Sequence, residues 1–151
     1  NSQIDGSDVV LLDQINVGMA VAVPDGLLVP VVQETDKLGL KEIAEETSRL
    51  ATAAREKKLS LAEMEGGTFS VTALGMFGVD AFTPVINPPN SGILGVGRIR
   101  DDVAWEGDIP IRVKRMTISL TWDHRVLDGA PAAEFAATIK KLLEQPLRLL
   151  G

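Results

Sequence analysis

Two helix-length segments, separated by short runs rich in β-branched residues, limit the folds open to this chain. In Leu40–Lys57, apolar residues recur at helical spacing while Lys and Glu fill the opposite side. Ala130–Gln145 carries a similar apolar stripe, with Pro131 near its first turn and Pro146 directly after its end. The sequence therefore predicts two amphipathic helices set among strands, which is an α/β chain.

The expected strands lie on either side of the first helix. Pro24-Asp25-Gly26 is a strong turn signal between two apolar runs, and Pro30 indicates an edge or a bulge in the second run. Near the C-terminus, apolar and hydroxyl side chains alternate, as in a strand with two different faces. The predicted strands are Val17–Val23, Leu27–Gln33, Thr68–Leu74, Ser91–Ile99 and Arg112–Trp122.

Three further segments carry local signals. Ser60–Glu63 has the form of a capping box and predicts a short helix that ends at Gly66-Gly67. Gly75–Gly78 predicts a glycine-bracketed turn. The apolar tail Leu147–Leu150 follows the second helix and either folds back on the core or docks into a neighbouring subunit.

Length and composition exclude several classes of function. The length of 151 residues predicts that residues 1–151 form a single domain. Because the chain has no cysteine and one histidine, an ordinary zinc site and a cysteine nucleophile are excluded. The net charge of −6 argues against nucleic-acid and anionic-membrane binding. The longest apolar runs are too short to span a bilayer. A local basic cluster is either a solvated strand face or a patch for an anionic ligand; it comprises Arg98, Arg100, Arg112, Lys114 and Arg115.

The single histidine, His124, lies where the alternating strand ends and the second helix begins. Strand-to-helix junctions are common places for functional side chains because rigid elements aim the loop, although a lone histidine is more often structural. Asp128, four residues on, has two compatible interpretations. With Gly129 it allows a tight turn that returns a carboxylate to the imidazole, and it is also placed to cap the helix.

Imidazole is suited to removing a proton from a thiol near neutral pH. A thioester attacked by that thiol develops a negative oxygen, so such a site also needs a hydrogen-bond donor. Spacing alone does not select the donor, and a hydroxyl nucleophile stays open, although no Gly-x-Ser-x-Gly elbow is present. The hydroxyl candidates are Ser70, Thr72, Thr83, Ser91, Ser119 and Thr121.

Four ordered blocks resemble one known family. Asp123–Gly129 is similar to the His-x-x-x-Asp-Gly signature of the dihydrolipoamide acyltransferases, the acyl-transferring components of 2-oxo acid dehydrogenase complexes. The short signature also occurs in chloramphenicol acetyltransferase and other coenzyme A-dependent acyltransferases. The other blocks, in order along the chain, are Gly26–Val32, Thr68–Gly78, and Ile86–Pro89 running into Ile93–Gly97.

The resemblance implies a mixed β-sheet flanked by helices, a chloramphenicol acetyltransferase-like fold that forms trimers. It also implies a hollow core built from those trimers, with the active site between two subunits. Coenzyme A and a lipoyl group would be the substrates, the lipoyl group being supplied by a separate domain, and no metal is expected. E1 and E3 components would be partners through domains absent here, and the compartment would be bacterial cytoplasm or mitochondrial matrix.

The resemblance further implies roles for four residues. His124 matches the family's general base, Asp128 matches the aspartate that orders its turn, and Phe82 matches an aromatic that lines the substrate channel, although it is equally readable as core filler. Thr72 stands where the family usually has the serine that stabilises the oxyanion. Threonine keeps the donor but adds a methyl group that restricts its rotamers.

The expected reaction is acyl exchange between dihydrolipoamide and coenzyme A, and Gly75–Gly78 looks more like the acetyl-transferring members. Because the family's catalytic domain normally begins earlier than the residue matching Asn1, we interpret the chain as an N-terminally truncated catalytic domain. The alternative is a catalytically impaired scaffold of the core. A stand-alone acetyltransferase for a small alcohol or amine is a third interpretation, which the other three blocks disfavour.

Overall fold

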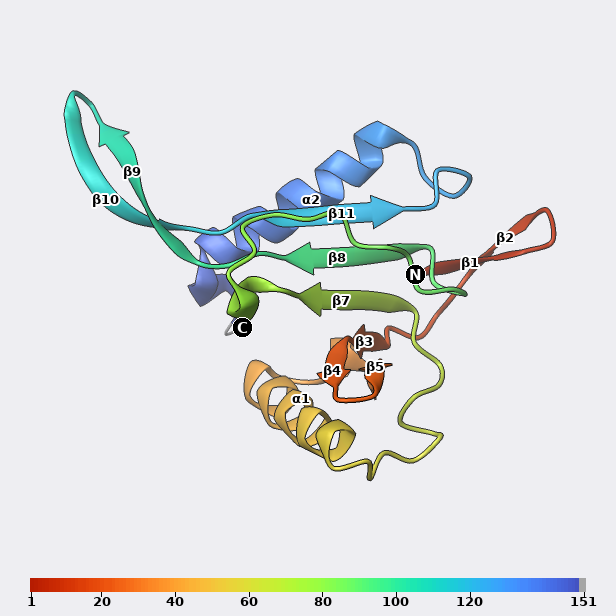
Figure 1. Cartoon of the computed structure of the whole chain (residues 1–151). Coiled ribbons are helices and arrows are strands. Elements are labelled where there is room, and N and C mark those ends of the chain that lie inside the picture. The colour runs from red at the N-terminus through yellow and green to blue at the C-terminus, as the bar shows by residue number, and fades with distance from the viewer. Residues whose placement is uncertain (150–151) are drawn as a thin grey trace.

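The computed structural model describes residues 1–149 and is organised around a five-stranded mixed sheet of order β11-β8-β7-β3-β6 (Figure 1). Strand β7 runs parallel to both of its neighbours, β3 and β8, whereas the two outer pairings are antiparallel. Strand β8, an inner strand of this sheet, has four of its five residues buried, as expected for a strand covered on both faces. The strands are β3 (Val17–Met19), β6 (Val31–Val32), β7 (Phe69–Ala73), β8 (Gly92–Val96) and β11 (Ile118–Trp122).

Three antiparallel hairpins surround this sheet. Figure 1 shows that one of them, β9–β10, projects well away from the body. The hairpins are formed by β1 (Ser2–Asp5) with β2 (Asp8–Leu11), β4 (Val21–Val23) with β5 (Gly26–Leu28), and β9 (Arg100–Glu106) with β10 (Ile109–Arg115).

The two predicted helices are present. Helix α1 (Leu40–Arg55) packs on β4 and β6 and buries Leu50 and Ala54 completely. Its first turn is closed by Glu42, whose carboxylate accepts from the Gly39 amide at 2.7 Å. Helix α2 (Gly129–Glu144) contacts β11. Short 3₁₀ helices occupy Thr35–Lys37 (η1), Gly75–Phe77 (η2) and Pro146–Leu149 (η3), and no helix among residues 1–149 is long and apolar enough to cross a membrane.

Strand register divides the side chains of the sheet between two faces. Phe69 and Trp122 belong to the face on which α2 packs, and the Phe69 and Phe135 rings meet edge to face at 5.9 Å. Ser70, Ile93 and Thr121 are aligned across β7, β8 and β11 and point to the opposite face. That second face is covered by the segment between η2 and β8.

Three of the strand predictions were wrong in their extent. Val17–Val23 and Leu27–Gln33 do turn at Pro24-Asp25, but each run splits into a strand of the central sheet and a strand of the separate β4–β5 hairpin. Arg112–Trp122 is likewise divided between β10 and β11. The division lies opposite the gap between β8 and β9, the strands with which β11 and β10 pair. In that gap the Arg98 amide donates to the Val79 carbonyl instead of to a neighbouring strand. Strand β9 was not expected.

The capping box at Ser60 forms, but the predicted helix does not. Both the Ser60 amide and its hydroxyl donate to the Glu63 carboxylate, at 2.8 and 2.7 Å. The Glu63 backbone carbonyl, which a helix would need for its own ladder, instead accepts from the Val31 amide at 2.8 Å. Residues 61–65 therefore make turns that hold the edge strand β6.

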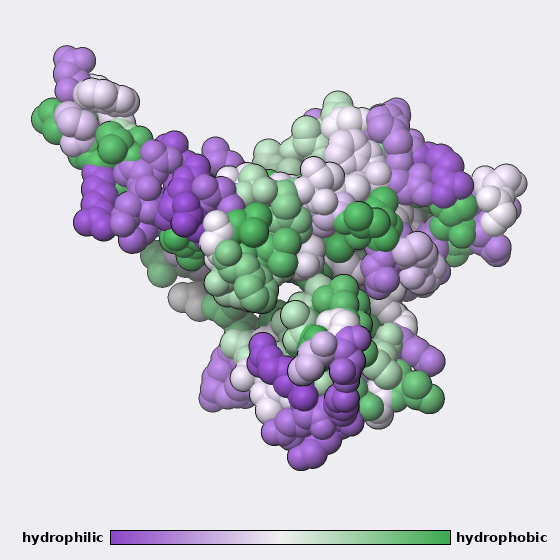
Figure 2. Space-filling view, in the orientation of Figure 1, coloured by the Kyte–Doolittle hydropathy of each residue, from purple (hydrophilic) through white to green (hydrophobic). Residues whose placement is uncertain are grey.

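The cations of the basic cluster are all paired within the molecule. Each of its cations is paired with an aspartate, and Figure 2 shows hydrophilic residues gathered at the base of the β9–β10 hairpin. Arg112 and Lys114 both bind Asp101 and hold the pKa of that carboxyl down, at about 2. These contacts match the solvated strand face, although the five cations share three carboxylates.

The apolar tail does not fold back over the core within the described residues. Leu147 is 79% exposed on η3, and Leu149 is partly exposed. Leu150, the last residue of the predicted docking segment, lies outside the described residues. Docking of this tail into a neighbouring subunit stays a prediction.

Candidate active site

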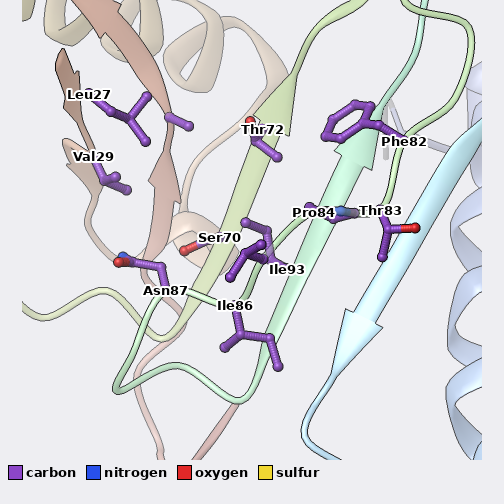
Figure 3. A pocket seen from close by; sticks show the side chains of 12 residues that line it. Leu27, Val29, Ser70, Thr72, Phe82, Thr83, Pro84, Ile86, Asn87 and Ile93 are labelled. Atoms are coloured by element: carbon purple, nitrogen blue, oxygen red, sulfur yellow. The ribbon is translucent and has the colours of Figure 1, made fainter.

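A cavity of about 340 Å³ lies against the sheet face opposite α2. Figure 3 shows its walls: Leu27 and Val29 on one side, Thr72 and Ser70 on β7, and Phe82, Thr83 and Pro84 on the other side. Three of the four sequence blocks meet here, because β5, β7 and the segment leading into β8 all contribute to the lining. The remaining lining residues are Ala20, Val85, Ile86, Asn87 and Ile93.

Thr72, the candidate oxyanion donor, lies on β7 with its side chain on the cavity face (Figure 3). It is half-buried, and in the described part of the chain its hydroxyl forms no hydrogen bond with protein. The hydroxyl is therefore free to donate to a ligand in the cavity.

Phe82, the candidate channel aromatic, lies over Gly95 near the carboxyl end of β8. A Cβ atom added at Gly95 would lie 3.0 Å from Phe82 Cζ and 3.2 Å from Pro84 Cδ. The absence of a side chain at Gly95 therefore allows the Phe82 ring to lie against β8. Phe82 both packs on the sheet and forms a wall of the cavity, so the structure allows either of its two interpretations.

A buried polar pair at the base of the cavity was missed by the sequence reasoning. Ser70, 1% exposed, lines the cavity and accepts a hydrogen bond of 2.8 Å from Asn90 Nδ2. Asn90 Oδ1 has no partner among the described residues. Asn90 follows a run of prolines that reads only as a loop, so no sequence signal indicated this long-range contact.

His124 lies in a compact turn that follows β11. The Asp123 amide donates to the Ser91 carbonyl at 2.8 Å and the Val126 amide to the Asp123 carbonyl at 3.0 Å. Arg125 closes a bidentate contact on the Asp123 carboxylate and holds the pKa of that carboxyl down, at about 2. The His124 side chain is 68% exposed on this turn.

Asp128 lies close to His124 but does not bond to it. Its Oδ1 is 3.7 Å from His124 Nδ1, which is an ion-pair distance and longer than a hydrogen bond. Asp128 occupies the N-cap position of α2, yet its side chain makes no capping bond. Both proposed roles of Asp128 stay predictions, and in this chain the turn is held by other contacts.

One chain does not bring His124 and Thr72 together. Thr72 is aligned with Gly95 and Ser119 across the sheet, and His124 follows Ser119 by five residues along β11 and its turn. At about 3.3 Å per strand residue, the two side chains are on the order of 15 Å apart along the strand direction alone. His124 is not among the residues that line the cavity.

Comparisons with known proteins assign the family. A family model described as 2-oxoacid dehydrogenases acyltransferase (catalytic domain) matches residues 1–151. The chain belongs to this acyltransferase family. The resemblance read from the four sequence blocks is therefore confirmed.

Two curated relatives show how far the similarity of this acyltransferase domain extends. The dihydrolipoyllysine-residue acetyltransferase component of the acetoin cleaving system of Bacillus subtilis is 43% identical over 150 residues, which are 99% of this chain and 38% of the relative. The dihydrolipoyllysine-residue succinyltransferase component of the 2-oxoglutarate dehydrogenase complex of Rickettsia bellii is 45% identical over 151 residues, with the same two coverages. The chain thus spans about 38% of the length of these relatives.

Solved structures confirm the fold of the acyltransferase domain. The dihydrolipoamide acetyltransferase of Azotobacter vinelandii and the cubic core of a pyruvate dehydrogenase multienzyme complex each align with a TM-score of 0.94 at 37% identity. Each alignment covers 100% of this chain and 63% of the other. The expected mixed sheet flanked by helices is therefore confirmed.

Proposed function

We propose that this domain exchanges an acyl group between dihydrolipoamide and coenzyme A, with His124 as the general base. The observation that carries the proposal is the combination, in a chain of this family, of an exposed histidine on a tightly held turn with a cavity that presents an unbonded hydroxyl. The histidine supplies a base for a thiol, and the hydroxyl supplies a donor for an oxyanion.

The reaction requires two proton transfers and no metal. Nδ1 of His124 faces Asp128, which leaves Nε2 to take the proton from the incoming thiol. The sulfur attacks the thioester carbonyl carbon, and the carbonyl oxygen, now negative, accepts a hydrogen bond from the Thr72 hydroxyl. Collapse of the tetrahedral species expels the other sulfur, which takes the proton back from the imidazolium.

The active site would be formed by two copies of the chain. Within one copy, His124 and Thr72 lie too far apart to act on the same carbonyl, so the His124 of one subunit would meet the Thr72 cavity of its neighbour. This arrangement agrees with a homotrimer that assembles into a larger core. One of the solved structures of similar fold is the cubic core of a pyruvate dehydrogenase multienzyme complex. The exposed Leu147 on η3 is available for contacts between trimers.

The acyl group we propose is acetyl. The two curated relatives divide between an acetyltransferase and a succinyltransferase, so similarity alone does not choose. The cavity supports acetyl, because none of the described residues that line it carries a charge. A succinyl group would place a carboxylate there with no cation from the same copy, which costs roughly several kcal/mol of lost hydration unless the neighbouring copy supplies one.

The remaining partners follow from the family. Coenzyme A would be a substrate, and the lipoyl group would arrive on a separate domain. E1 and E3 components of a 2-oxo acid dehydrogenase complex would act before and after this step, through segments other than residues 1–151. Such complexes would place the protein in bacterial cytoplasm or in the mitochondrial matrix.

Mixed assemblies test the two-copy site. His124→Ala and Thr72→Val, each inactive alone, would be co-expressed in equal amounts and purified together. If each site takes its histidine and its threonine from different copies, about a quarter of the sites are intact after random mixing, and about a quarter of wild-type activity returns. If both residues act within one copy, every site stays defective and the mixture is inactive.

A further inference from the structure

The indole of Trp122 spans the turn that carries His124. Trp122 is the last residue of β11, and its Nε1–H donates to the backbone carbonyl of Leu127 at 2.8 Å. The two bonded residues lie on opposite limbs of the turn, with His124 between them. The bond is partly buried, and Trp122 and Leu127 both line the apolar pocket between the sheet and α2.

The other contacts of this turn hold residues 123–126 and do not reach the limb that leads into α2. The Asp123–Arg125 pair joins the two residues that flank His124, is exposed, and does not reach Leu127. The Val126 amide closes the turn around His124 by donating to the Asp123 carbonyl, and the Asp123 amide donates to Ser91, but neither bond includes Leu127. Within residues 1–149, the indole bond is the side-chain hydrogen bond that ties the end of β11 to the limb that leads into α2.

The indole also lies beside the imidazole. The Trp122 and His124 ring centroids are 6.0 Å apart, with the planes tilted by 36°. A movement of the turn relative to β11 would therefore change the position of the imidazole. Replacing Trp122 with an aromatic residue that has no N–H at this point would leave the Leu127 carbonyl, in a partly buried position, without its donor.

We propose that Trp122 is a positioning residue, whose N–H bond to Leu127 fixes the turn so that His124 is held in place for proton transfer. This role rests on the proposed function of His124. A phenylalanine fits the apolar pocket but lacks the donor, so the N–H group rather than the bulk of the ring carries the effect. Loss of one hydrogen bond of the usual net strength corresponds to a decrease in kcat of about 3- to 10-fold.

The test compares Trp122→Phe with wild type and with Trp105→Phe in the full chain. Trp105 is the other tryptophan, 69% exposed on the β9–β10 hairpin, so the matched substitution controls for loss of an indole elsewhere. For Trp122→Phe we expect kcat for acetyl transfer to fall about 3- to 10-fold while both KM values change less than about 2-fold. Trp105→Phe should keep the wild-type kcat.

Hydrogen exchange gives a second readout that does not depend on activity. The Arg125 and Val126 amides, both bonded to Asp123, should exchange faster in Trp122→Phe, with α1 amides unchanged. Trp122→Leu, which is apolar and has no donor, should behave in the same way and replaces the first variant if that variant fails to fold.

The outcomes separate the two proposals. Wild-type kcat and wild-type amide exchange in both Trp122 variants would overturn the positioning role, while a loss of activity in His124→Ala would still support the function. Wild-type activity in His124→Ala would overturn the proposed function itself, whatever the Trp122 variants do. A rise in KM alone would also contradict the positioning role, because it would indicate a binding defect.

Discussion

Thr72 and His124 lie at opposite ends of the central sheet. β7 and β11 run in opposite directions, and each residue lies near or just beyond the carboxyl end of its strand. A cavity with a hydrogen-bond donor is thereby separated from a base that faces outward. The arrangement suits a reaction in which two substrates approach from different sides and the site is completed by a second copy.

The Thr72 hydroxyl should matter to kcat more than to KM. Thr72→Val keeps the shape of the side chain and removes the donor, so turnover should fall by about 10²–10³-fold. Thr72→Ser keeps the donor and should stay within about 10-fold of wild type, a smaller loss than removal of the donor. Steady-state kinetics with acetyl-coenzyme A would check both variants. Equal rates for wild type and Thr72→Val would assign the oxyanion donor to another residue.

The uncharged cavity should discriminate among acyl groups by charge. We expect succinyl-coenzyme A to react with a kcat/KM at least roughly 100-fold below that of acetyl-coenzyme A, because its carboxylate finds no cation among the lining residues that this copy contributes. Butyryl-coenzyme A has a similar length without the charge and serves as the control. Butyryl transfer within about 10-fold of acetyl would show that charge rather than size decides. Succinyl transfer as fast as acetyl would contradict the proposed acyl group.

Alanine substitutions at two glycines should have different effects on the free energy of unfolding. A Cβ atom at Gly97 would lie 2.0 Å from the Asp80 backbone carbonyl oxygen, and backbone cannot move aside easily. Gly97→Ala should therefore lower the free energy of unfolding by about 3 kcal/mol or more. Gly129, the first residue of α2, has open space around it, and Gly129→Ala should be neutral or stabilising by up to about 1 kcal/mol. Urea unfolding of both variants would check the pair, and similar destabilisation by the two would contradict it.

The Asp123 carboxyl should titrate well below its ordinary range. Hydrogen bonds from the Arg125 side chain and amide hold its pKa at about 2. Because this pKa is lower in the folded state, the ionised Asp123 stabilises the turn at pH values above the ordinary carboxyl pKa. That stabilisation is lost as the pH falls toward about 2 and the carboxylate is protonated. Carbon NMR of the carboxyl would give the midpoint, and Arg125→Gln should raise it toward the ordinary aspartate value. An unchanged midpoint in that variant would show that Arg125 is not the cause.

Local patterns were sufficient to predict the elements with strong periodicity. Helix α1 ends within two residues of its expected end because its apolar spacing and its terminal residues agree. The position of His124 between β11 and α2 was predicted from the same kind of signal. The four sequence blocks gave the family, and three of them meet at the cavity.

Features that depend on distant partners were not predictable from local patterns. The alternation from Arg112 to Trp122 has no break of its own, and the division into β10 and β11 comes from the interruption of the partner strand at Gly97–Ile99. The capping box at Ser60 is locally correct, but the Val31 amide takes the carbonyl that a helix would use. The Ser70–Asn90 hydrogen bond joins residues twenty positions apart, and no periodic pattern in the sequence indicates such a contact.

The most direct test of the central claim is acyl transfer from acetyl-coenzyme A to dihydrolipoamide, measured on this chain and on His124→Ala. Sedimentation of both proteins would establish that the substitution leaves assembly unchanged. The account predicts transfer by the wild-type chain and a loss of about 10²–10⁴-fold in the variant, the range for removal of a general base. Equal transfer by the two proteins would contradict the role of His124, and assembly without transfer by either would make the chain a scaffold.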